Sequence, residues 1–272
     1  MKIALTIAGS DSGGGAGIQA DLKTFHQLGV FGTSAIAAIT AQNTIGVTDW
    51  QAVPTKLVLA QIEAVATDLP PDAVKTGMLG SSEIVEAVAA SIRRFEMKNY
   101  VLDPVMVATS GDLLIETDAV EAIRRQLVPL AAVVTPNADE AAVMCGFAVT
   151  DLNSMRQAAE AILAMGARSV LVKGGHVTWT NPAEVIDLLC DGEFIEFRHA
   201  RIDTTSTHGT GCTLSAAIAA SLAKGATVRE SVQVATDFVH EALRTAPGLG
   251  RGHGPLNHFA FGNAPTNSFT SA

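Results

Sequence analysis

Apolar positions recur along the chain in two patterns, and each pattern predicts one kind of element. Short, nearly continuous apolar runs are typical of strands buried on both faces of a sheet. Longer segments with apolar residues every three or four positions indicate helices that bury one side. Strands are predicted at 3–8, 34–41, 73–76, 101–103, 132–135 and 169–173. Helices are predicted at 18–28, 56–67, 84–95, 119–127, 154–165 and 227–244, with two more beginning near residues 138 and 210.

The alternation of strand and helix predicts the class of fold. It continues for most of the chain without a Pro- or Ser-rich linker and without an internal repeat. We therefore expect one α/β domain over residues 1–260, with a mostly parallel sheet covered by helices on both faces. Asp191-Gly192 lies between two alternating runs and predicts an antiparallel hairpin. The small, polar residues 261–272 are predicted to form a frayed tail.

Two helix starts carry a hydroxyl residue followed three positions later by Glu or Gln, which is the pattern of a capping box. They are Ser154 with Gln157 and Thr227 with Glu230. We expect these pairs to set where the two helices begin.

Composition narrows the possible partners and the compartment. The 272 residues are 48% hydrophobic and carry a formal net charge of −9. An acidic chain without a Lys/Arg cluster is a poor binder of nucleic acid or of an anionic membrane surface. No stretch approaches the roughly 20 apolar residues of a membrane helix, and the N-terminus lacks the features of a signal peptide. The three cysteines show no C-x-x-C spacing, which favours a reducing cytoplasm over a disulfide framework or a zinc site.

Polar residues and glycines directly follow the predicted strands. In open α/β sheets, ligands bind beyond the carboxyl ends of the strands. We therefore expect one binding site to gather segments from separate strands, namely 9–11, 42–43, 77–78, Asp103, Asn137 and 173–175.

Residues 207–213 form the most informative loop, because two glycines there precede a run of small and apolar helix formers. A helix that begins in this way presents free backbone N–H groups and the positive end of its dipole, both of which suit a phosphate. Cys212 stands at this helix start, where a thiolate is favoured. The alternative is an ordinary Gly-rich turn before a core helix.

A dinucleotide-binding fingerprint fails at the first strand-to-helix turn. Gly13 and Gly15 match the beginning of its spacing, but Ile18 stands where the last Gly or Ala is needed. No suitable acidic residue closes a second strand about 20 residues later. These glycines instead let the backbone approach a small ligand.

Together these segments resemble the ribokinase-like superfamily and, within it, the hydroxymethylpyrimidine/phosphomethylpyrimidine kinases of thiamine biosynthesis. The resemblance runs from Ile3 to about His258. The family's motifs stand here in order as LTIAGSD (5–11) with GGAGIQADL (14–22), AQNT (41–44), KTGML (75–79), LDPVM (102–106), TPNADE (135–140), KGGH (173–176) and THGTGCTLSAA (207–217). Each motif alone is weak, whereas seven in this order are highly specific.

The resemblance implies a fold and an activity. It implies a three-layer α/β/α fold that uses ATP and Mg²⁺. The enzyme would phosphorylate the hydroxymethyl group of the pyrimidine and then the resulting monophosphate. Members of this family are usually homodimers or larger homo-oligomers, and we expect the same here.

The resemblance also assigns the catalytic groups. The backbone N–H groups of Gly209, Thr210, Gly211 and Cys212 would form an anion hole for the transferred phosphoryl group. Most sugar-kinase relatives carry an aspartate base where this chain has Cys212, as the pyrimidine-kinase branch does. The thiolate would accept the proton of the substrate hydroxyl, or the side chain would only position the substrate, since a loose transition state asks little of a base.

Five further positions match the family's nucleotide and metal sites. Lys173, Asn137 and Thr207 would contact the nucleotide, while Glu140 and Asp103 would lie near Mg²⁺, Glu140 through water. Three of them also have a simpler interpretation. Lys173 would be a solvated charge at a strand end, Asn137 a helix cap, and Asp103 a structural turn residue.

The ring would be recognised by Gln42, whose amide both donates and accepts hydrogen bonds, and by Asp21, which is otherwise a surface charge. The positions expected to wall the ring are Gly9, Ala16, Met78 and Val105. Without the resemblance, Met78 and Val105 would be taken as ordinary core residues.

Two other functions remain open. A pyridoxal or pyridoxine kinase shares the fold and phosphorylates a similar ring alcohol, and Cys212 does not exclude it, although Gln42 and Met78 favour the pyrimidine. A ligand-binding protein without catalysis would have lost the anion-hole glycines, Lys173 or Glu140, and all of these are present.

Overall fold

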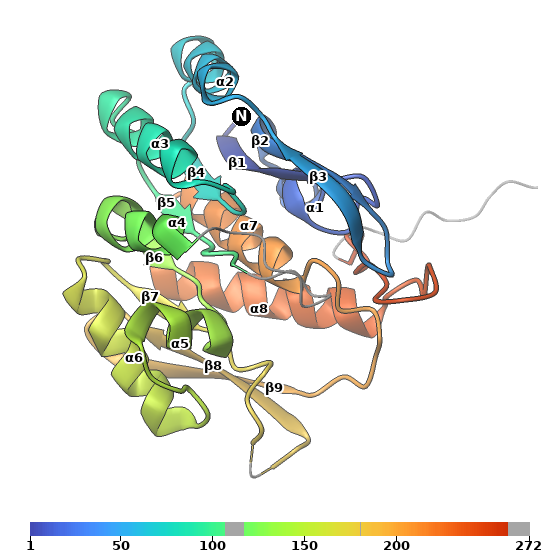
Figure 1. Cartoon of the computed structure of the whole chain (residues 1–272). Coiled ribbons are helices and arrows are strands. Elements are labelled where there is room, and N and C mark those ends of the chain that lie inside the picture. The colour runs from blue at the N-terminus through green and yellow to red at the C-terminus, as the bar shows by residue number, and fades with distance from the viewer. Residues whose placement is uncertain (107–116, 180, 261–272) are drawn as a thin grey trace, which may run out of the picture.

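The sheet runs through the whole molecule (Figure 1). The computed structural model describes residues 1–106, 117–179 and 181–260, so the tail predicted at 261–272 lies outside the described residues. Within the described residues, the strands form one sheet in the order β3-β2-β1-β4-β5-β6-β7-β8-β9. Their bounds are β1 Ile3–Asp11, β2 Phe31–Gln42, β3 Val47–Ala52, β4 Ala73–Thr76, β5 Tyr100–Leu102, β6 Val133–Val134, β7 Val170–Val172, β8 Glu184–Cys190 and β9 Phe194–Ala200.

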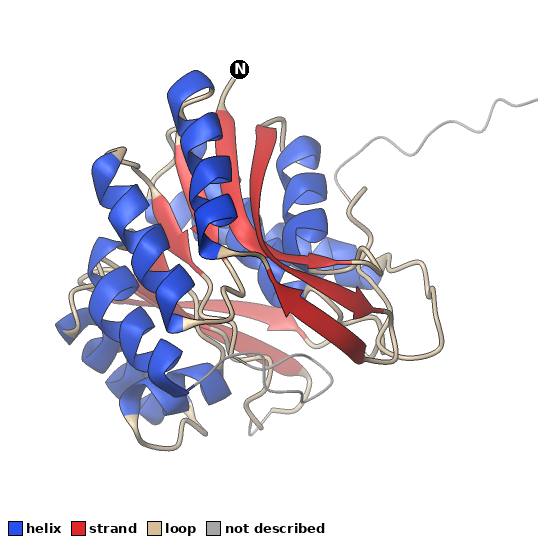
Figure 2. Ribbon diagram, turned by 45° about the horizontal axis from the view of Figure 1, so that its top comes forward, coloured by secondary structure: helices blue, strands red, loops and turns tan. Residues whose placement is uncertain are grey.

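Helices cover both faces of this sheet, as Figure 2 shows. Side chains of α1, α7 and α8 pack in one apolar cluster, whereas those of α2 to α6 pack in a second cluster. The prediction of a three-layer α/β/α fold is therefore confirmed. The helices are α1 Gly17–Gln27, α2 Thr55–Asp68, α3 Ser82–Arg94, α4 Thr117–Ala122, α5 Ala138–Cys145, α6 Leu152–Ala164, α7 Thr210–Ala223 and α8 Val228–Arg244.

The direction of the strands decides where a ligand can bind. The six strands from β2 to β7 in the sheet order are parallel, and β3, β8 and β9 are antiparallel additions at the two edges. The carboxyl ends of β1, β2, β4, β5 and β7 therefore share one edge of the sheet. Asp11, Gln42, Asp103 and Lys173 stand at or directly after these ends.

Helix α7 is the most deeply placed helix, and its composition explains why. Ala and Ser make up half of its 14 residues, and every residue from Thr213 to Ala223 is buried. Small side chains allow the helix axis to approach the sheet closely, so its first turn lies directly over the carboxyl edge. No helix among the described residues has both the length and the apolar character that crossing a membrane requires.

Two local predictions differ from the structure. Strand β3 was not predicted, because nearly all of its side chains are exposed and the chain there lacks an alternating pattern. The capping box predicted for Ser154 with Gln157 is wrong, since Asp151 caps α6 and Ser154 is its partner at the third position. The predicted and the observed capping boxes begin one turn apart, at Ser154 and at Asp151. The carboxylate of Asp151 is a stronger hydrogen-bond acceptor than the hydroxyl of Ser154, so the helix begins after Asp151. The Thr227–Glu230 box and the antiparallel hairpin β8–β9 are both confirmed.

Candidate active site

A cavity of about 700 Å³ opens at the carboxyl edge of the sheet, between α7 and the strand ends. It brings together residues that are far apart in the sequence. With one exception, Asp21, every predicted site residue lines it: Gly9, Ala16, Gln42, Met78, Asp103, Val105, Asn137, Glu140, Lys173, Thr207, Gly209, Thr210, Gly211 and Cys212.

The start of α7 is built by Gly209, which adopts a left-handed backbone with φ of 84°. A side chain at this position would clash with the carbonyl oxygen of Gly15, so glycine is needed for space as well as for φ. The hydroxyl of Thr210 donates to the carbonyl oxygen of Thr207 at 2.7 Å and fixes the turn. The first turn of α7 thus lines the cavity in a fixed frame, with backbone N–H groups of the kind that an anion hole requires. The N–H group of Thr210 itself donates to the carbonyl oxygen of Thr207 at 3.3 Å.

Cys212 is half-buried and lines the cavity in the first turn of α7. Burial raises the pKa of its thiol to about 11, and the carboxylates of Asp21 and Asp103 add to this effect. The ammonium of Lys75 and the N–H of Gly17 oppose it. The expectation that the helix start alone favours a thiolate is therefore not met, because desolvation outweighs it.

Lys75 and Asp21 form a fully buried ion pair beneath the cavity. The Nζ of Lys75 lies 2.9 and 3.0 Å from the two carboxylate oxygens of Asp21, which also accepts a 2.6 Å hydrogen bond from Thr6. Both charged side chains have no exposed surface. The surface-charge interpretation of Asp21 is thus wrong, and its carboxylate is directed at Lys75 rather than at a ligand.

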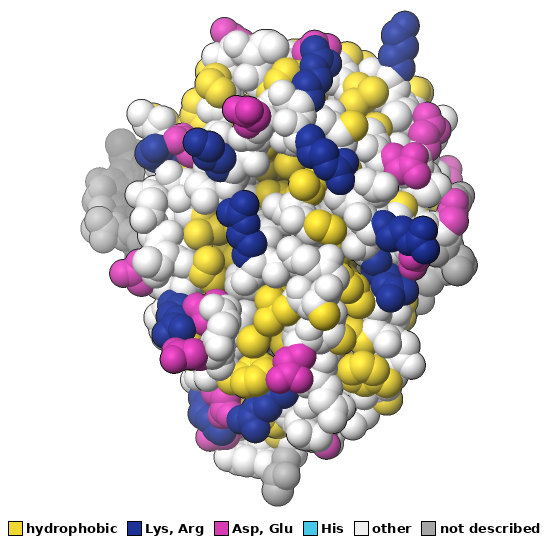
Figure 3. Space-filling model, turned by 90° about the vertical axis from the view of Figure 1, so that its left-hand side faces the viewer, with side chains coloured by type: hydrophobic (Ala, Val, Ile, Leu, Met, Phe, Trp, Pro, Cys, Tyr) yellow, Lys and Arg dark blue, Asp and Glu magenta, His cyan; other side chains and the backbone are white. Residues whose placement is uncertain are grey.

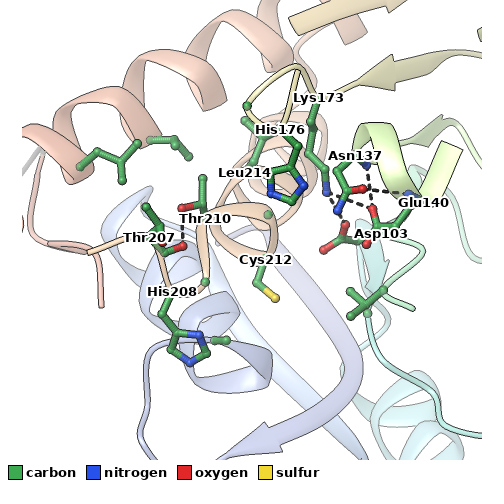
Figure 4. A pocket seen from close by; sticks show the side chains of 18 of the residues that line it. Asp103, Asn137, Glu140, Lys173, His176, Thr207, His208, Thr210, Cys212 and Leu214 are labelled. Carbon is green, nitrogen blue, oxygen red and sulfur yellow. Dashed lines mark hydrogen bonds and ion pairs between the residues drawn. The ribbon is translucent and has the colours of Figure 1, made fainter. Parts of the chain in front are cut away.

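A second charged cluster joins β5, α5 and β7, as Figure 4 shows. Lys173 Nζ lies 3.0 Å from Asp103 and 3.7 Å from Glu140. Asn137 and Glu140 form a capping box at the start of α5, with hydrogen bonds of 2.7 and 2.8 Å. Asn137 is therefore a helix cap, and it also faces the cavity. The interpretation of Lys173 as a solvated charge is wrong, because its side chain is only 14% exposed.

The protonation of this cluster follows from burial and from its cation. Burial raises the pKa of Asp103, but Lys173 and Lys75 outweigh it and bring the pKa below its ordinary value. Burial raises the pKa of Glu140 to about 7, against the opposing effect of Lys173. Asp103 is therefore ionised at neutral pH, while Glu140 is poised to gain or lose a proton.

Two carboxylates that line the same cavity suit Mg²⁺, because proteins hold this ion through one or two carboxylates together with phosphates and water. Asp103 and Glu140 supply two carboxylates here, and their oxygens lie 3.0 and 3.7 Å from the same ammonium nitrogen of Lys173. Among the residues the structure describes, no three acidic, His or Cys side chains gather as a complete metal site. A Mg²⁺ ion here would therefore depend on the phosphates of a nucleotide.

The other end of the cavity is suited to a flat ring. Met78 and Val105 pack with Ala38 in a small apolar cluster that is separate from the main core. Gln42 lies beside them on the cavity wall, and its carbonyl oxygen accepts a 3.1 Å hydrogen bond from Thr40. The cavity also reaches α8, where Val239 and Leu243 offer an apolar surface.

Three residues of the site were not assigned a role from the sequence: Lys75, Asp11 and His208. Lys75 lies within a short buried strand, and Asp21 lies on the apolar face of the predicted first helix. A charge in each of these places needs a partner, so this pair had a detectable signal. The contact between Asp11 and His208, which are 197 positions apart, had none.

The fold places the chain among small-molecule kinases of the ribokinase-like type. A solved ADP complex of Bacillus subtilis pyridoxal kinase is 39% identical, with a TM-score of 0.88 over 96% of this chain and 98% of that one. A solved phosphomethylpyrimidine kinase from Clostridium difficile is 41% identical, with a TM-score of 0.79 over 89% and 100% of the two chains.

The sequence comparisons then identify the family within that fold. The sequence model of the phosphomethylpyrimidine kinase family matches residues 11–257, and the chain belongs to this family. The hydroxymethylpyrimidine/phosphomethylpyrimidine kinase of Rhizobium meliloti is 54% identical over 261 residues, which cover 94% of this chain and 97% of that protein.

Proposed function

We propose that this enzyme transfers the γ-phosphoryl group of ATP to 4-amino-5-hydroxymethyl-2-methylpyrimidine and then to the resulting monophosphate. The product would be the pyrimidine diphosphate used in thiamine biosynthesis. The observation that carries the proposal is one cavity that joins a ring-sized apolar end to the phosphate-binding start of α7. The family match and the 54% identical relative support the same activity.

Phosphoryl transfer depends on placing the attacking oxygen in line and on stabilising charge that spreads over the phosphoryl oxygens. The N–H groups of residues 209–212 would stabilise that charge, and Lys173 would neutralise a phosphate beside them. A Cβ at Gly211 would lie 3.1 Å from Lys173 Nζ. One phosphate could therefore contact both the ammonium and the anion hole. Asn137 and Thr207 would complete the nucleotide contacts.

Mg²⁺ would be held near Asp103 and Glu140, whose carboxylates flank the same ammonium of Lys173. The ion would neutralise the phosphates of ATP. Glu140 loses a proton readily near pH 7, so a cation near it would bring it fully to the carboxylate.

Cys212 would receive the proton of the substrate hydroxyl. The resting thiol is protonated at neutral pH, so this role uses the small thiolate fraction that Lys75 helps to sustain. Asp21 then has a different task from the one predicted, because it holds Lys75 instead of binding the ring.

The ring would lie against the side chains of Met78 and Val105, with Gly9 and Ala16 also lining its site. Gln42 would donate its amide N–H to a ring nitrogen and accept from the exocyclic amine. A pyridoxal ring presents different groups at these positions.

Pyridoxal phosphorylation is the second candidate, because the solved Bacillus subtilis pyridoxal kinase shares the fold at 39% identity. The higher identity to the Rhizobium kinase and the presence of Gln42 favour the pyrimidine. We therefore expect pyridoxal to be at most a side substrate.

The enzyme would act in the cytoplasm as a homodimer or larger homo-oligomer. Cys145, Cys190 and Cys212 are free thiols, as a reducing compartment favours. Ile39, Trp50 and Leu57 on β2, β3 and α2 expose large apolar surfaces that a second copy would cover.

On the face shown in Figure 3, basic and acidic side chains are interspersed, so that face offers no basic area for nucleic acid. Analytical ultracentrifugation of the purified enzyme would measure its oligomeric state, and cell fractionation would show its compartment.

The proposed function is tested with purified enzyme, Mg·ATP and the hydroxymethylpyrimidine, followed by phosphorus NMR. The expected result is a monophosphate that is later converted to a diphosphate, with ADP formed in each step. One phosphorylation only, or none, would contradict the proposal.

A further inference from the structure

Two glycine-rich loops meet at the cavity, and they are packed against each other without spare room. The ring loop (residues 12–16) follows β1, and the phosphate loop (residues 207–211) leads into α7. A Cβ at Gly15 would clash with the ring of His208, and one at Gly209 would clash with the carbonyl oxygen of Gly15. Movement of one loop must therefore move the other.

The carboxylate of Asp11 is the centre of this contact. One of its oxygens accepts hydrogen bonds from the N–H groups of Gly15 (3.0 Å) and Ala16 (2.8 Å), and the other accepts from Gly13 (2.8 Å). Burial raises the pKa of Asp11, but the hydrogen bonds from His208 and the backbone outweigh it and leave the pKa below its ordinary value. An ionised carboxylate thus fixes the shape of the ring loop.

His208 extends this network into the phosphate loop. Its Nε2 lies 2.8 Å from Asp11, and its backbone N–H donates to Gly254 at 3.1 Å. Because a carboxylate only accepts, Nε2 carries the proton and donates it to Asp11. The imidazole is buried, with 10% of its side chain exposed, so no solvent competes for this bond.

The same imidazole also touches the residue expected to read the ring. The amide nitrogen of Gln42 lies 3.4 Å from His208 Nε2. Both atoms are donors when His208 bonds to Asp11, so they are neighbours and not hydrogen-bond partners. The N–H groups of Gln42 therefore remain available for a ligand, and the imidazole limits where the amide can lie.

We propose that the Asp11–His208 pair is a positioning device that couples the ring end of the cavity to the anion hole. Resting on the function proposed above, a ring bound at Gln42 holds His208 and Asp11 in place. The phosphate loop is then ordered for the nucleotide. Neither residue is the base or the acid of the reaction, since their hydrogen bonds are directed at the two loops.

Such coupling is measurable as reciprocal affinity, because each ligand must then strengthen the binding of the other. The dissociation constant of the hydroxymethylpyrimidine is measured by calorimetry with and without a non-hydrolysable ATP analogue and Mg²⁺. In the wild type, the analogue should tighten pyrimidine binding by at least about fivefold, which is the lower end of typical couplings.

Three variants separate coupling from folding. His208→Ala removes the bridge, and its coupling should fall below about twofold while each ligand still binds alone. His208→Gln keeps an N–H close to the place of Nε2 and should restore part of the coupling. His258→Gln is the matched control, because His258 is also buried and contacts Thr213 of α7 at 3.1 Å outside the cavity. It should alter the melting temperature and leave the coupling unchanged.

Turnover provides a second readout. In His208→Ala, kcat should fall by about 10²-fold, as a displacement of about 1 Å can cause, with a smaller change in KM. Wild-type affinities that do not depend on the analogue, or full coupling in His208→Ala, would overturn the inference. Wild-type enzyme that fails to phosphorylate the pyrimidine would instead contradict the proposed function, so the two failures are distinguishable.

Discussion

Cys212 and Lys75 occupy the same small region at the start of α7, and the protonation of one depends on the other. Burial keeps the thiol protonated near neutral pH, while the buried ammonium pulls its pKa down. Lys75 is itself held by Asp21, so three residues from α7, β4 and α1 set the charge at the point where the substrate hydroxyl would lie. Catalysis by a thiolate base therefore becomes a question of pH.

The pH dependence of kcat/KM tests Cys212 directly. Well below a pKa of about 11, the thiolate fraction rises about tenfold per pH unit, so kcat/KM should rise about 100-fold between pH 7 and 9 if the thiolate is the base. Cys212→Ala should lose this slope and reduce turnover by roughly 10²–10⁴-fold.

Two serine variants serve as controls for that experiment. Cys145→Ser changes a thiol outside the cavity and should preserve the profile. Cys212→Ser keeps a small polar group that does not ionise in this range. If Cys212→Ser retained near-normal turnover and the wild-type profile were flat, Cys212 would only position the substrate.

The Lys75–Asp21 pair makes a prediction about stability. Lys75→Met leaves the Asp21 carboxylate buried without its cation, which typically costs about 3–5 kcal/mol in the free energy of unfolding. Urea unfolding at pH 7 measures this loss. The double variant Lys75→Met/Asp21→Leu removes both charges and should recover most of it. If Lys75→Met were as stable as the wild type, removing the cation would not leave a costly buried charge at Asp21, and the prediction would be wrong.

At the residue scale, the sequence was informative where a family motif marks a position, and uninformative about partners. Gln42, Cys212 and Lys173 could be placed at the cavity from strand ends and motifs. Lys75 and Asp21 each stand where a charge needs a partner, but their pairing with each other depends on how α1 packs against β1 and α7, which no local pattern contains. Burial, which sets the pKa of Cys212, likewise depends on the complete fold.

At the element scale, the first turn of α7 is the segment from which we expect both the anion hole and Cys212. Its geometry depends on the left-handed Gly209 and on the absence of a side chain at Gly209 and at Gly15, where this turn meets the ring loop. The neighbouring strands contribute only short polar ends. We therefore expect the helix start, not the strands, to define where phosphate binds.

Gly209→Ala tests this geometry against a matched glycine. Gly225 also has a positive φ, of 92°, but a Cβ there would meet nothing within 4 Å. Gly225→Ala should cost only the backbone strain of about 1–2 kcal/mol, with kcat unchanged. Gly209→Ala adds a clash with Gly15, so the melting temperature and kcat should both fall further. Equal effects of the two substitutions in calorimetry and activity assays would contradict a special role for Gly209.

Elements with strong periodicity were predictable, and exposed or overlapping ones were not. The helices around α3 and α8 have a clear apolar side, and β4 was predicted with its observed bounds. β3 carries no pattern because it lies at the sheet edge and faces solvent on most positions. The start of α6 was misplaced because two capping patterns compete within one turn.

At the scale of the whole molecule, one continuous sheet connects the ring end and the nucleotide end of the cavity. β1 and β2 supply the ring side, while β5 and β7 supply Asp103 and Lys173. This arrangement supports our proposal that residues 1–260 form one domain. It also explains why strand alternation alone could predict the fold class, whereas the shape of the cavity could not be predicted.

The central claim is that this cavity selects a pyrimidine alcohol and phosphorylates it twice. The most direct measurement gives the enzyme Mg·ATP with hydroxymethylpyrimidine and pyridoxal side by side and compares kcat/KM for the two rings. We predict a clear preference for the pyrimidine, together with formation of its diphosphate. Turnover of pyridoxal alone, or accumulation of a monophosphate that is never phosphorylated again, would contradict the account.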